Sequence, residues 1–169
     1  MLDISQILKN LEAVPDTKNK GTEYEIIDDI LYVKGSDDIS DWLINFSTID
    51  REVHTGFLIE STMIYVKVRN KDIKMVVGHS AGGSIACLLG FALKVPVITF
   101  GSPRFYHQEK SKKIDDFCNK MATHYILKRD PICYLPFWYS KKSGNRIIVK
   151  NDKLWGHYIK DYARNLAGR

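Results

Sequence analysis

A serine flanked by small residues is the position in this chain best suited to covalent chemistry. Ser80 stands in the pentapeptide Gly78-His79-Ser80-Ala81-Gly82, between the apolar residues 73–77 and a helix-patterned run that begins at Gly83. Gly-x-Ser-x-Gly between a strand and a helix is typical of a nucleophile elbow, a sharp turn that lifts the serine hydroxyl clear of the sheet. Small neighbours let the helix start tight against the strand, with its N–H groups aimed where an oxyanion would form. The motif predicts a serine hydrolase; the alternative is a tight turn with a solvated serine.

A nucleophilic serine requires a base, and the base requires a carboxylate that orients it. After a turn of this kind the acid and then the histidine follow the serine along the chain. Asp130 comes directly after an expected strand at 124–128, and Pro131 favours the extended backbone that ends the strand there. His157 lies in the last segment, where a loop can lower an imidazole onto the serine. We therefore predict Ser80 as nucleophile, Asp130 as orienting acid and His157 as general base.

Other histidines and carboxylates are weaker candidates for these roles. His107 precedes the acid in the chain, and His124 opens the strand that should deliver it. We expect His79 to be a packing or hydrogen-bonding residue and His54 to brace a loop. The remaining carboxylates either come late in the chain or are expected to face water from a helix: Asp152, Asp161, Asp115 and Asp116.

Hydrophobic spacing predicts the elements that must position these residues. Helices are expected over residues 4–11, 37–46, 56–70, 80–93 and 108–121, with a last one after His157. Strands are expected over residues 24–27, 30–35, 73–77, 95–100, 124–128 and 146–149, with Asp28-Asp29 as a hairpin turn. Residues 64–68 could also form a strand, but we choose a helix because the next strand needs a crossover to join a parallel sheet. The alternation predicts a three-layer α/β fold with a mostly parallel central sheet.

Composition narrows the class of protein. A chain of 169 residues with 44% hydrophobic and 27% charged residues fits one compact domain spanning residues 1–169. The net charge of +5 is mild and the basic residues are scattered, so we do not expect nucleic-acid binding. The three cysteines are far apart and predict buried free thiols without metal-ligand spacing. Without a basic leader or an apolar run of membrane length, we expect an intracellular, soluble protein; the oligomeric state stays open.

Several segments, in order along the chain, resemble the class 3, fungal-type lipase family of α/β-hydrolases. They are residues 31–36 with Asp41-Trp42, residues 53–57, the elbow at 77–83, residues 99–104, Arg129-Asp130-Pro131 with Leu135-Pro136, and His157-Tyr158. Together they cover roughly residues 30 to 160, and their joint specificity far exceeds that of the elbow alone.

This resemblance implies an α/β-hydrolase fold with Ser80, Asp130 and His157 as the catalytic residues. It also implies an oxyanion hole made by the backbone N–H groups of Ser36 and Ala81, with the Ser36 hydroxyl as a further candidate donor. Ser36 could equally cap a helix, and the two roles are compatible. No metal or cofactor is implied.

The chain departs from the family in three ways. Little sequence lies between Ser36 and His54 from which a lid could be built. Ala81 stands where the family usually has leucine, which would widen the acyl site without removing the N–H. The interval between Asp130 and His157 is short.

Aromatic residues follow the acid directly and could contact the substrate. Tyr134, Phe137 and Trp138 are expected to line an acyl pocket or to dip into lipid, unless their loop folds into the core. Trp42 is expected either in a reduced lid or packed on the sheet.

The leading hypothesis is hydrolysis of carboxylic esters, foremost lipid acyl esters, through an acyl-enzyme. The expected partners are a lipid or small ester and the surface of a membrane. One alternative passes the acyl group to an alcohol or a thiol, as an acyltransferase or thioesterase does. Another is a lipase-like binding or regulatory scaffold that has lost catalysis.

Overall fold

The strands of the described residues form one mixed sheet at the centre of the molecule. The computed structural model describes residues 3–15, 22–35, 52–141 and 143–167. Its six strands follow the order β1-β2-β3-β4-β5-β6. β1 (Glu23–Ile27) is antiparallel to β2 (Ile30–Lys34), and every later pair is parallel. The later strands are β3 (Met75–His79), β4 (Val97–Phe100), β5 (Ala122–Leu127) and β6 (Asn145–Val149). The predicted mostly parallel sheet is confirmed.

The hairpin between the first two strands turns at Asp28 and Asp29, as predicted. Ile27 pairs with Ile30, so the loop consists of Asp28 and Asp29 alone. Their φ angles are 50° and 62°, in the left-handed region that a two-residue turn of this twist requires. Aspartate tolerates this region better than most residues, because its short polar side chain can bond locally.

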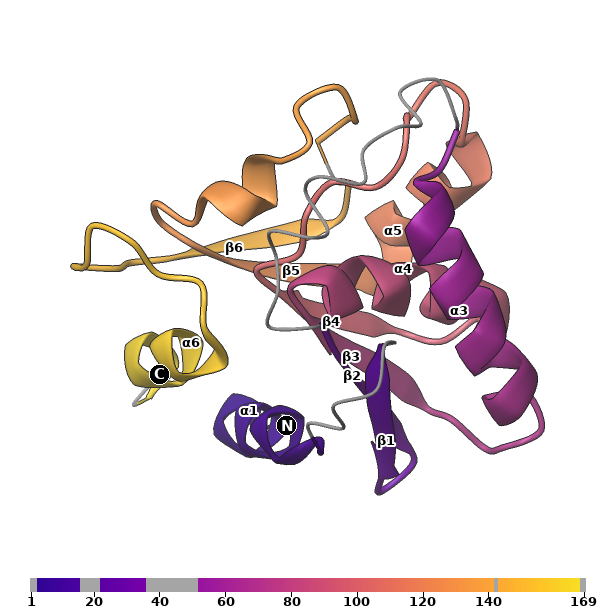
Figure 1. Ribbon diagram of the computed structural model, residues 1–169, viewed down its shortest axis with the longest axis horizontal. Coiled ribbons are helices and arrows are strands. Elements are labelled where there is room, and N and C mark those ends of the chain that lie inside the picture. The colour runs from indigo at the N-terminus through magenta and orange to yellow at the C-terminus, as the bar shows by residue number, and fades with distance from the viewer. Residues whose placement is uncertain (1–2, 16–21, 36–51, 142, 168–169) are drawn as a thin grey trace.

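Helices cover both faces of the sheet and complete three layers (Figure 1). α3 (Thr55–Val68), α4 (Ala81–Leu93) and α5 (Lys112–Met121) lie on one face. α1 (Ile4–Ala13) and α6 (Ile159–Leu166) lie on the other. Alternate strand residues divide between the two cores: Leu31 and Val33 pack toward α3 and α4, whereas Tyr32 packs toward α1 and α6.

Two helix predictions differ in outcome. The segment expected over residues 56–70 is the helix α3, which ends at Val68, and no part of it is a strand, as we chose on the crossover argument. The helix expected from residue 108 begins only at Lys112. The backbone N–H of Gln108 donates to Ser140 Oγ at 3.0 Å, and that of His107 donates to the Glu52 carbonyl at 3.0 Å. Neighbouring segments therefore hold the chain at these two residues, and the helix begins after them. The expected helix at 37–46 lies outside the described residues.

The carboxyl ends of the parallel strands meet at one edge, where sheets of this type bind ligands. Ser80 follows β3, Gly101 follows β4, and Asp130 follows β5 after a short turn. All three cysteines are buried and none of them forms a disulfide, as predicted. No helix within the described ranges is long and apolar enough to cross a membrane.

Candidate active site

The turn at Ser80 has the backbone conformation of a nucleophile elbow. Its φ and ψ are 54° and −132°, a region that costs a residue with a side chain about 1–3 kcal/mol. The Ser80 N–H donates to the Phe100 carbonyl at 2.9 Å, which anchors the turn to β4. A β-carbon on Gly78 would lie 2.3 Å from the Gly82 carbonyl oxygen, and one on Gly82 would lie 2.4 Å from that of Val33. Gly78 and Gly82 are therefore required, because the backbone segments at this turn approach each other too closely to leave room for a β-carbon.

Three polar side chains from three segments meet at this turn. His157 Nε2 lies 2.9 Å from Ser80 Oγ, and His157 Nδ1 lies 2.8 Å from Asp130 Oδ2. All three are buried, with 3%, 2% and 0% of Ser80, His157 and Asp130 exposed. A carboxylate only accepts, so Nδ1 carries the proton and the lone pair of Nε2 faces the serine hydroxyl. The structure thus brings together the three residues that we predicted as nucleophile, base and acid.

Further donors hold the carboxylate of Asp130. It begins the short helix η1 (Pro131–Tyr134), and its Oδ1 accepts the Ile132 N–H at 3.0 Å. Its Oδ2 accepts the hydroxyl of Tyr162 at 3.0 Å, and that hydroxyl accepts the Leu127 N–H at 3.2 Å. Burial above all raises the pKa of Tyr162 well above its usual range, so the phenol remains a neutral donor. Both oxygens of the acid are therefore fixed in orientation.

His79 holds the backbone of His157. Its Nε2 lies 2.6 Å from the His157 carbonyl oxygen. Because a carbonyl only accepts, this nitrogen must carry the proton. Burial, and then the nearby charge of His157, lower the pKa of His79 to about 3, so the ring is neutral near pH 7. His79 is a hydrogen-bonding residue, as expected, and its partner is the backbone of the proposed base.

A glycine leaves the space that these groups occupy. Gly101 has φ +61°, and a β-carbon there would lie 3.0 Å from Asp130 Oδ2, His157 Cε1 and Tyr162 Oη. Any side chain at the end of β4 would press on Asp130, His157 and Tyr162 together. Gly101 therefore shapes the site through the absence of a side chain.

Comparison with known proteins decides the family. Residues 30–140 match the family model described as lipase (class 3). The chain belongs to the class 3 lipase family. Among curated proteins, the secreted mono- and diacylglycerol lipase 2 of Gibberella zeae is 30% identical over an alignment of 132 residues, with a coverage of 59% of this chain and 32% of that protein.

Two solved structures show how far the likeness of these class 3 lipases extends. The lipase of the Rhizomucor miehei lipase–propeptide complex is 19% identical, with a TM-score of 0.58, over 76% of this chain and 52% of that one. A mutant MDLA of Penicillium cyclopium is 16% identical, with a TM-score of 0.63, over 87% of this chain and 66% of that one. The fold is the α/β-hydrolase fold. This chain spans about a third of the Gibberella protein and about half of the Rhizomucor chain.

One of the two oxyanion donors predicted from the class 3 resemblance can be located. Ala81 is the first residue of α4, directly after the serine, and is 7% exposed. Gly35, directly after β2, packs closely against Ala81: a β-carbon on Gly35 would lie only 2.9 Å from the Ala81 nitrogen. The Gly35 N–H donates to the His79 carbonyl at 3.2 Å and holds the strand there. Ser36 lies outside the described residues, and the oxyanion role of both residues stays a prediction.

The aromatic loop after the acid is divided between surface and core. Tyr134 and Phe137 are 44% and 75% exposed, whereas Tyr139 is buried. Trp138 contacts Phe137 edge to face, with ring centroids 4.9 Å apart. The loop is therefore neither wholly in the core nor wholly at the surface. Trp42 lies outside the described residues, and the substrate-binding roles remain predictions.

Two rival residues have structural partners instead. His124 Nδ1 lies 2.7 Å from Thr99 Oγ1, and its Nε2 lies 3.0 Å from the Ser143 carbonyl oxygen. Asp115, which we expected to face water, is half-buried and accepts hydrogen bonds from Tyr106 and Ser143. That expectation was wrong, because Tyr106 from the segment before α5 and Ser143 from the loop before β6 supply donors that helix spacing cannot show.

Sequence reasoning missed two residues that touch the triad. Gly101 lies in the segment 99–104 that resembled the family, so a signal existed but was not used. Nothing in the sequence distinguishes Tyr162, because only the return of α6 along the sheet brings its hydroxyl to Asp130.

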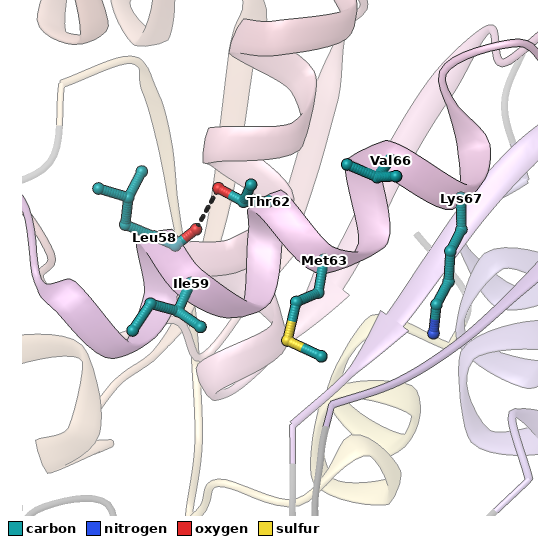
Figure 2. A pocket seen from close by; sticks show the side chains of 6 residues that line it. All are labelled: Leu58, Ile59, Thr62, Met63, Val66 and Lys67. Carbon is teal, nitrogen blue, oxygen red and sulfur yellow. Dashed lines mark hydrogen bonds between the residues drawn. The ribbon is translucent and has the colours of Figure 1, made fainter.

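An apolar hollow on α3 is a separate feature of this chain. Figure 2 shows its side chains on the outer face of the helix, with the Thr62 hydroxyl donating to the Leu58 carbonyl at 2.7 Å. It is lined by Leu58, Ile59, Thr62, Met63, Val66 and Lys67. None of these residues belongs to the triad, so the hollow does not form part of the candidate active site.

Proposed function

We propose that this class 3 lipase chain hydrolyses carboxylic esters of lipids through an acyl-enzyme on Ser80. The observation that carries the proposal is the unbroken line of hydrogen bonds from Ser80 Oγ through His157 to Asp130, at 2.9 and 2.8 Å. Groups within hydrogen-bond reach, with the base oriented by a third group, are what nucleophilic catalysis by serine requires.

Acylation follows from the proton positions. His157 Nε2 takes the Ser80 proton while Oγ attacks the ester carbonyl carbon, and the carbonyl oxygen becomes an oxyanion. The Ala81 and Ser36 N–H groups would stabilise that oxyanion, and one such donor is typically worth about 3 kcal/mol of barrier. Asp130 stabilises the imidazolium. When the intermediate collapses, the proton passes from Nε2 to the leaving alcohol.

Deacylation repeats these steps with water. Water gives a proton to His157 and attacks the acyl carbon, and collapse returns that proton to Ser80 Oγ and releases the carboxylic acid. The side chains and backbone amides supply every step, so the proposal calls for no metal or cofactor. If an alcohol or thiol replaced the water, the same groups would make an acyltransferase or thioesterase.

Relatives suggest the substrate class. The name of the Gibberella zeae relative specifies mono- and diacylglycerols, and we propose acylglycerols for this chain also. Tyr134, Phe137 and Trp138 remain the proposed acyl-chain contacts, supported by the exposure of Phe137 and by the start of their loop at the proposed acid. A silent scaffold is less well supported, because the three groups are present and hydrogen-bonded in sequence.

Contact with a lipid surface is part of the same proposal. Phe137 is 75% exposed, and an aromatic side chain at that position can enter the interface of a membrane. The name of the Gibberella relative describes a secreted protein, whereas the sequence of this chain predicted an intracellular one. The cellular location stays a prediction.

The test is hydrolysis of p-nitrophenyl esters from acetyl to palmitoyl by wild type, Ser80→Ala and His157→Ala. We expect kcat/KM to rise with chain length and to fall by about 10⁴ or more in both variants. His107→Ala serves as the matched control and should retain wild-type rates. A fluorophosphonate should label wild type and not Ser80→Ala. If wild type is no faster than Ser80→Ala on every ester, the scaffold is the better interpretation.

A further inference from the structure

Three cationic side chains from separate segments converge on one small cavity outside the triad. Arg104 follows β4, Lys141 lies in the loop before β6, and Arg146 is the second residue of β6. The cavity is lined by Arg104, Ile126, Cys133, Tyr134, Lys141 and Arg146. No carboxylate is among these residues, and none of the three cations forms a salt bridge within the described part of the chain. The cavity is therefore a concentration of uncompensated positive charge.

The guanidinium of Arg104 is held in a fixed orientation. Its Nη1 donates to the carbonyl oxygens of Phe137 and Tyr139 at 3.3 and 3.2 Å. Its backbone N–H donates to the Leu135 carbonyl at 2.7 Å. The remaining N–H groups of the planar fork stay available to an external acceptor. A side chain that is already ordered loses less entropy when it binds a ligand.

Like charges are kept close together at this cavity. Burial, and then the nearby charge of Arg146, lower the pKa of the Arg104 guanidinium. The protein thus holds two guanidinium groups where they repel each other. An anion bound between them would turn this repulsion into attraction.

The size of the cavity and its neighbours indicate the class of anion. Its inner space holds about one water molecule, so one ligand oxygen can enter while the rest of the ligand stays outside. A phosphoryl group has several charged oxygens that can meet three cations from different directions, whereas one arginine alone satisfies a carboxylate. Tyr134 lines the cavity, and Phe137 accepts a hydrogen bond from Arg104 through its carbonyl. Both side chains expose aromatic surface that the organic part of a phosphate ester could contact.

We propose that Arg104, Lys141 and Arg146 bind a phosphoryl group at this cavity. A phospholipid headgroup and a soluble phosphate ester present the same chemistry there. The site uses none of the triad residues, so it goes beyond the proposed ester hydrolysis. It can be tested in a Ser80→Ala background, in which its failure is distinct from a failure of catalysis.

The first experiment titrates inorganic phosphate into the full chain carrying Ser80→Ala and follows binding by NMR. Adding Lys141→Gln and Arg146→Gln should weaken phosphate binding by about tenfold or more, because two charged partners are lost. A matched control carries Lys113→Gln and Lys120→Gln on α5 and has the same net charge. The control should bind as tightly as its parent.

The second experiment identifies the source of the phosphoryl group. The same three proteins are sedimented with phosphatidylcholine vesicles, with and without phosphatidic acid. Binding only to phosphatidic acid, lost in the Lys141 and Arg146 variant and displaced by free phosphate, supports a lipid headgroup. Phosphate binding without vesicle binding supports a soluble phosphate ester. The proposal is overturned if phosphate does not bind, or if both double variants change binding equally.

Discussion

The hydroxyl of Tyr162 donates to Oδ2 of Asp130 at 3.0 Å, the same oxygen that accepts the His157 Nδ1–H at 2.8 Å. A phenol on α6 and the imidazole of the proposed base therefore share one carboxylate oxygen. The acid is held by its neighbours from several sides before any substrate arrives. We therefore expect the orientation of the His157 ring to depend on Tyr162.

Tyr162→Phe removes this donor while it keeps the ring. We expect kcat to fall about tenfold with little change in KM, because a hydrogen bond to a charged group is worth about 1.5–3 kcal/mol and only part of it acts on the base. Steady-state kinetics on a p-nitrophenyl ester measures the effect. Tyr158→Phe, at a residue that is 56% exposed, is the control. A variant with wild-type kcat and only a lower melting temperature would show that Tyr162 is merely structural.

Gly101→Ala introduces a β-carbon that must lie 3.0 Å from the acid, the base and Tyr162, at φ +61°. We expect activity to fall by about a hundredfold or more, because small displacements of reacting groups are costly. We also expect a loss of stability of about 1–3 kcal/mol from backbone strain. Gly56→Ala is the control, since the nearest atoms to its new β-carbon would lie 3.3 and 3.4 Å away on His54. Retention of most activity in Gly101→Ala would contradict the crowding at the triad.

His79 makes stability depend on pH. Its pKa is about 3 in the folded chain and about 6.5 in an unfolded one. The contribution of His79 to the free energy of unfolding is complete above pH 6.5 and declines as the pH falls toward 3. In that range the unfolded chain binds a proton at His79, whereas the folded chain does not. The slope is about 1.4 kcal/mol per pH unit.

His79→Gln separates this titration from the hydrogen bond. A glutamine amide can still donate to the His157 carbonyl but does not titrate. Chemical unfolding between pH 4 and 7 should therefore show a shallower loss of stability in the variant than in wild type. His107→Gln, at a half-buried position, should follow the wild-type curve. Parallel curves for wild type and His79→Gln would mean that His79 does not resist protonation.

Lys153 anchors the segment that carries His157. Its Nζ lies 2.6 Å from Oδ1 of Asp161, which is 2% exposed. Burial by itself raises the pKa of Asp161. The hydrogen bond and the charge of Lys153, together with backbone hydrogen bonds, lower it by more, so the pKa of Asp161 lies below its usual value. Lys153→Met should destabilise the fold by about 1–3 kcal/mol near pH 7, because it leaves a buried carboxylate without its cation. Denaturant unfolding measures this; Lys150→Met, at an exposed lysine of the same segment, should cost almost nothing.

The order and type of most elements could be predicted because local chemistry determines them. Asp28-Asp29 suits the left-handed turn of the hairpin, and the apolar alternation at Leu31, Tyr32 and Val33 serves two cores. The start of α5 could not be predicted, because His107 and Gln108 are held by Glu52 and Ser140, which lie far away in the chain.

The sequence by itself determined that Ser80 occupies a strained turn, because only small residues fit there, and it singled out Asp130 and His157 by their order. The tertiary structure decided the rest. Tyr162 reaches Asp130, His79 holds the backbone of His157, and Gly101 leaves the space between them. None of this follows from spacing along the chain, because these contacts form only when the ends of separate strands and α6 are packed at one edge of the sheet. The physical reason is that periodicity specifies which face of an element is buried, whereas packing specifies which polar atoms meet there.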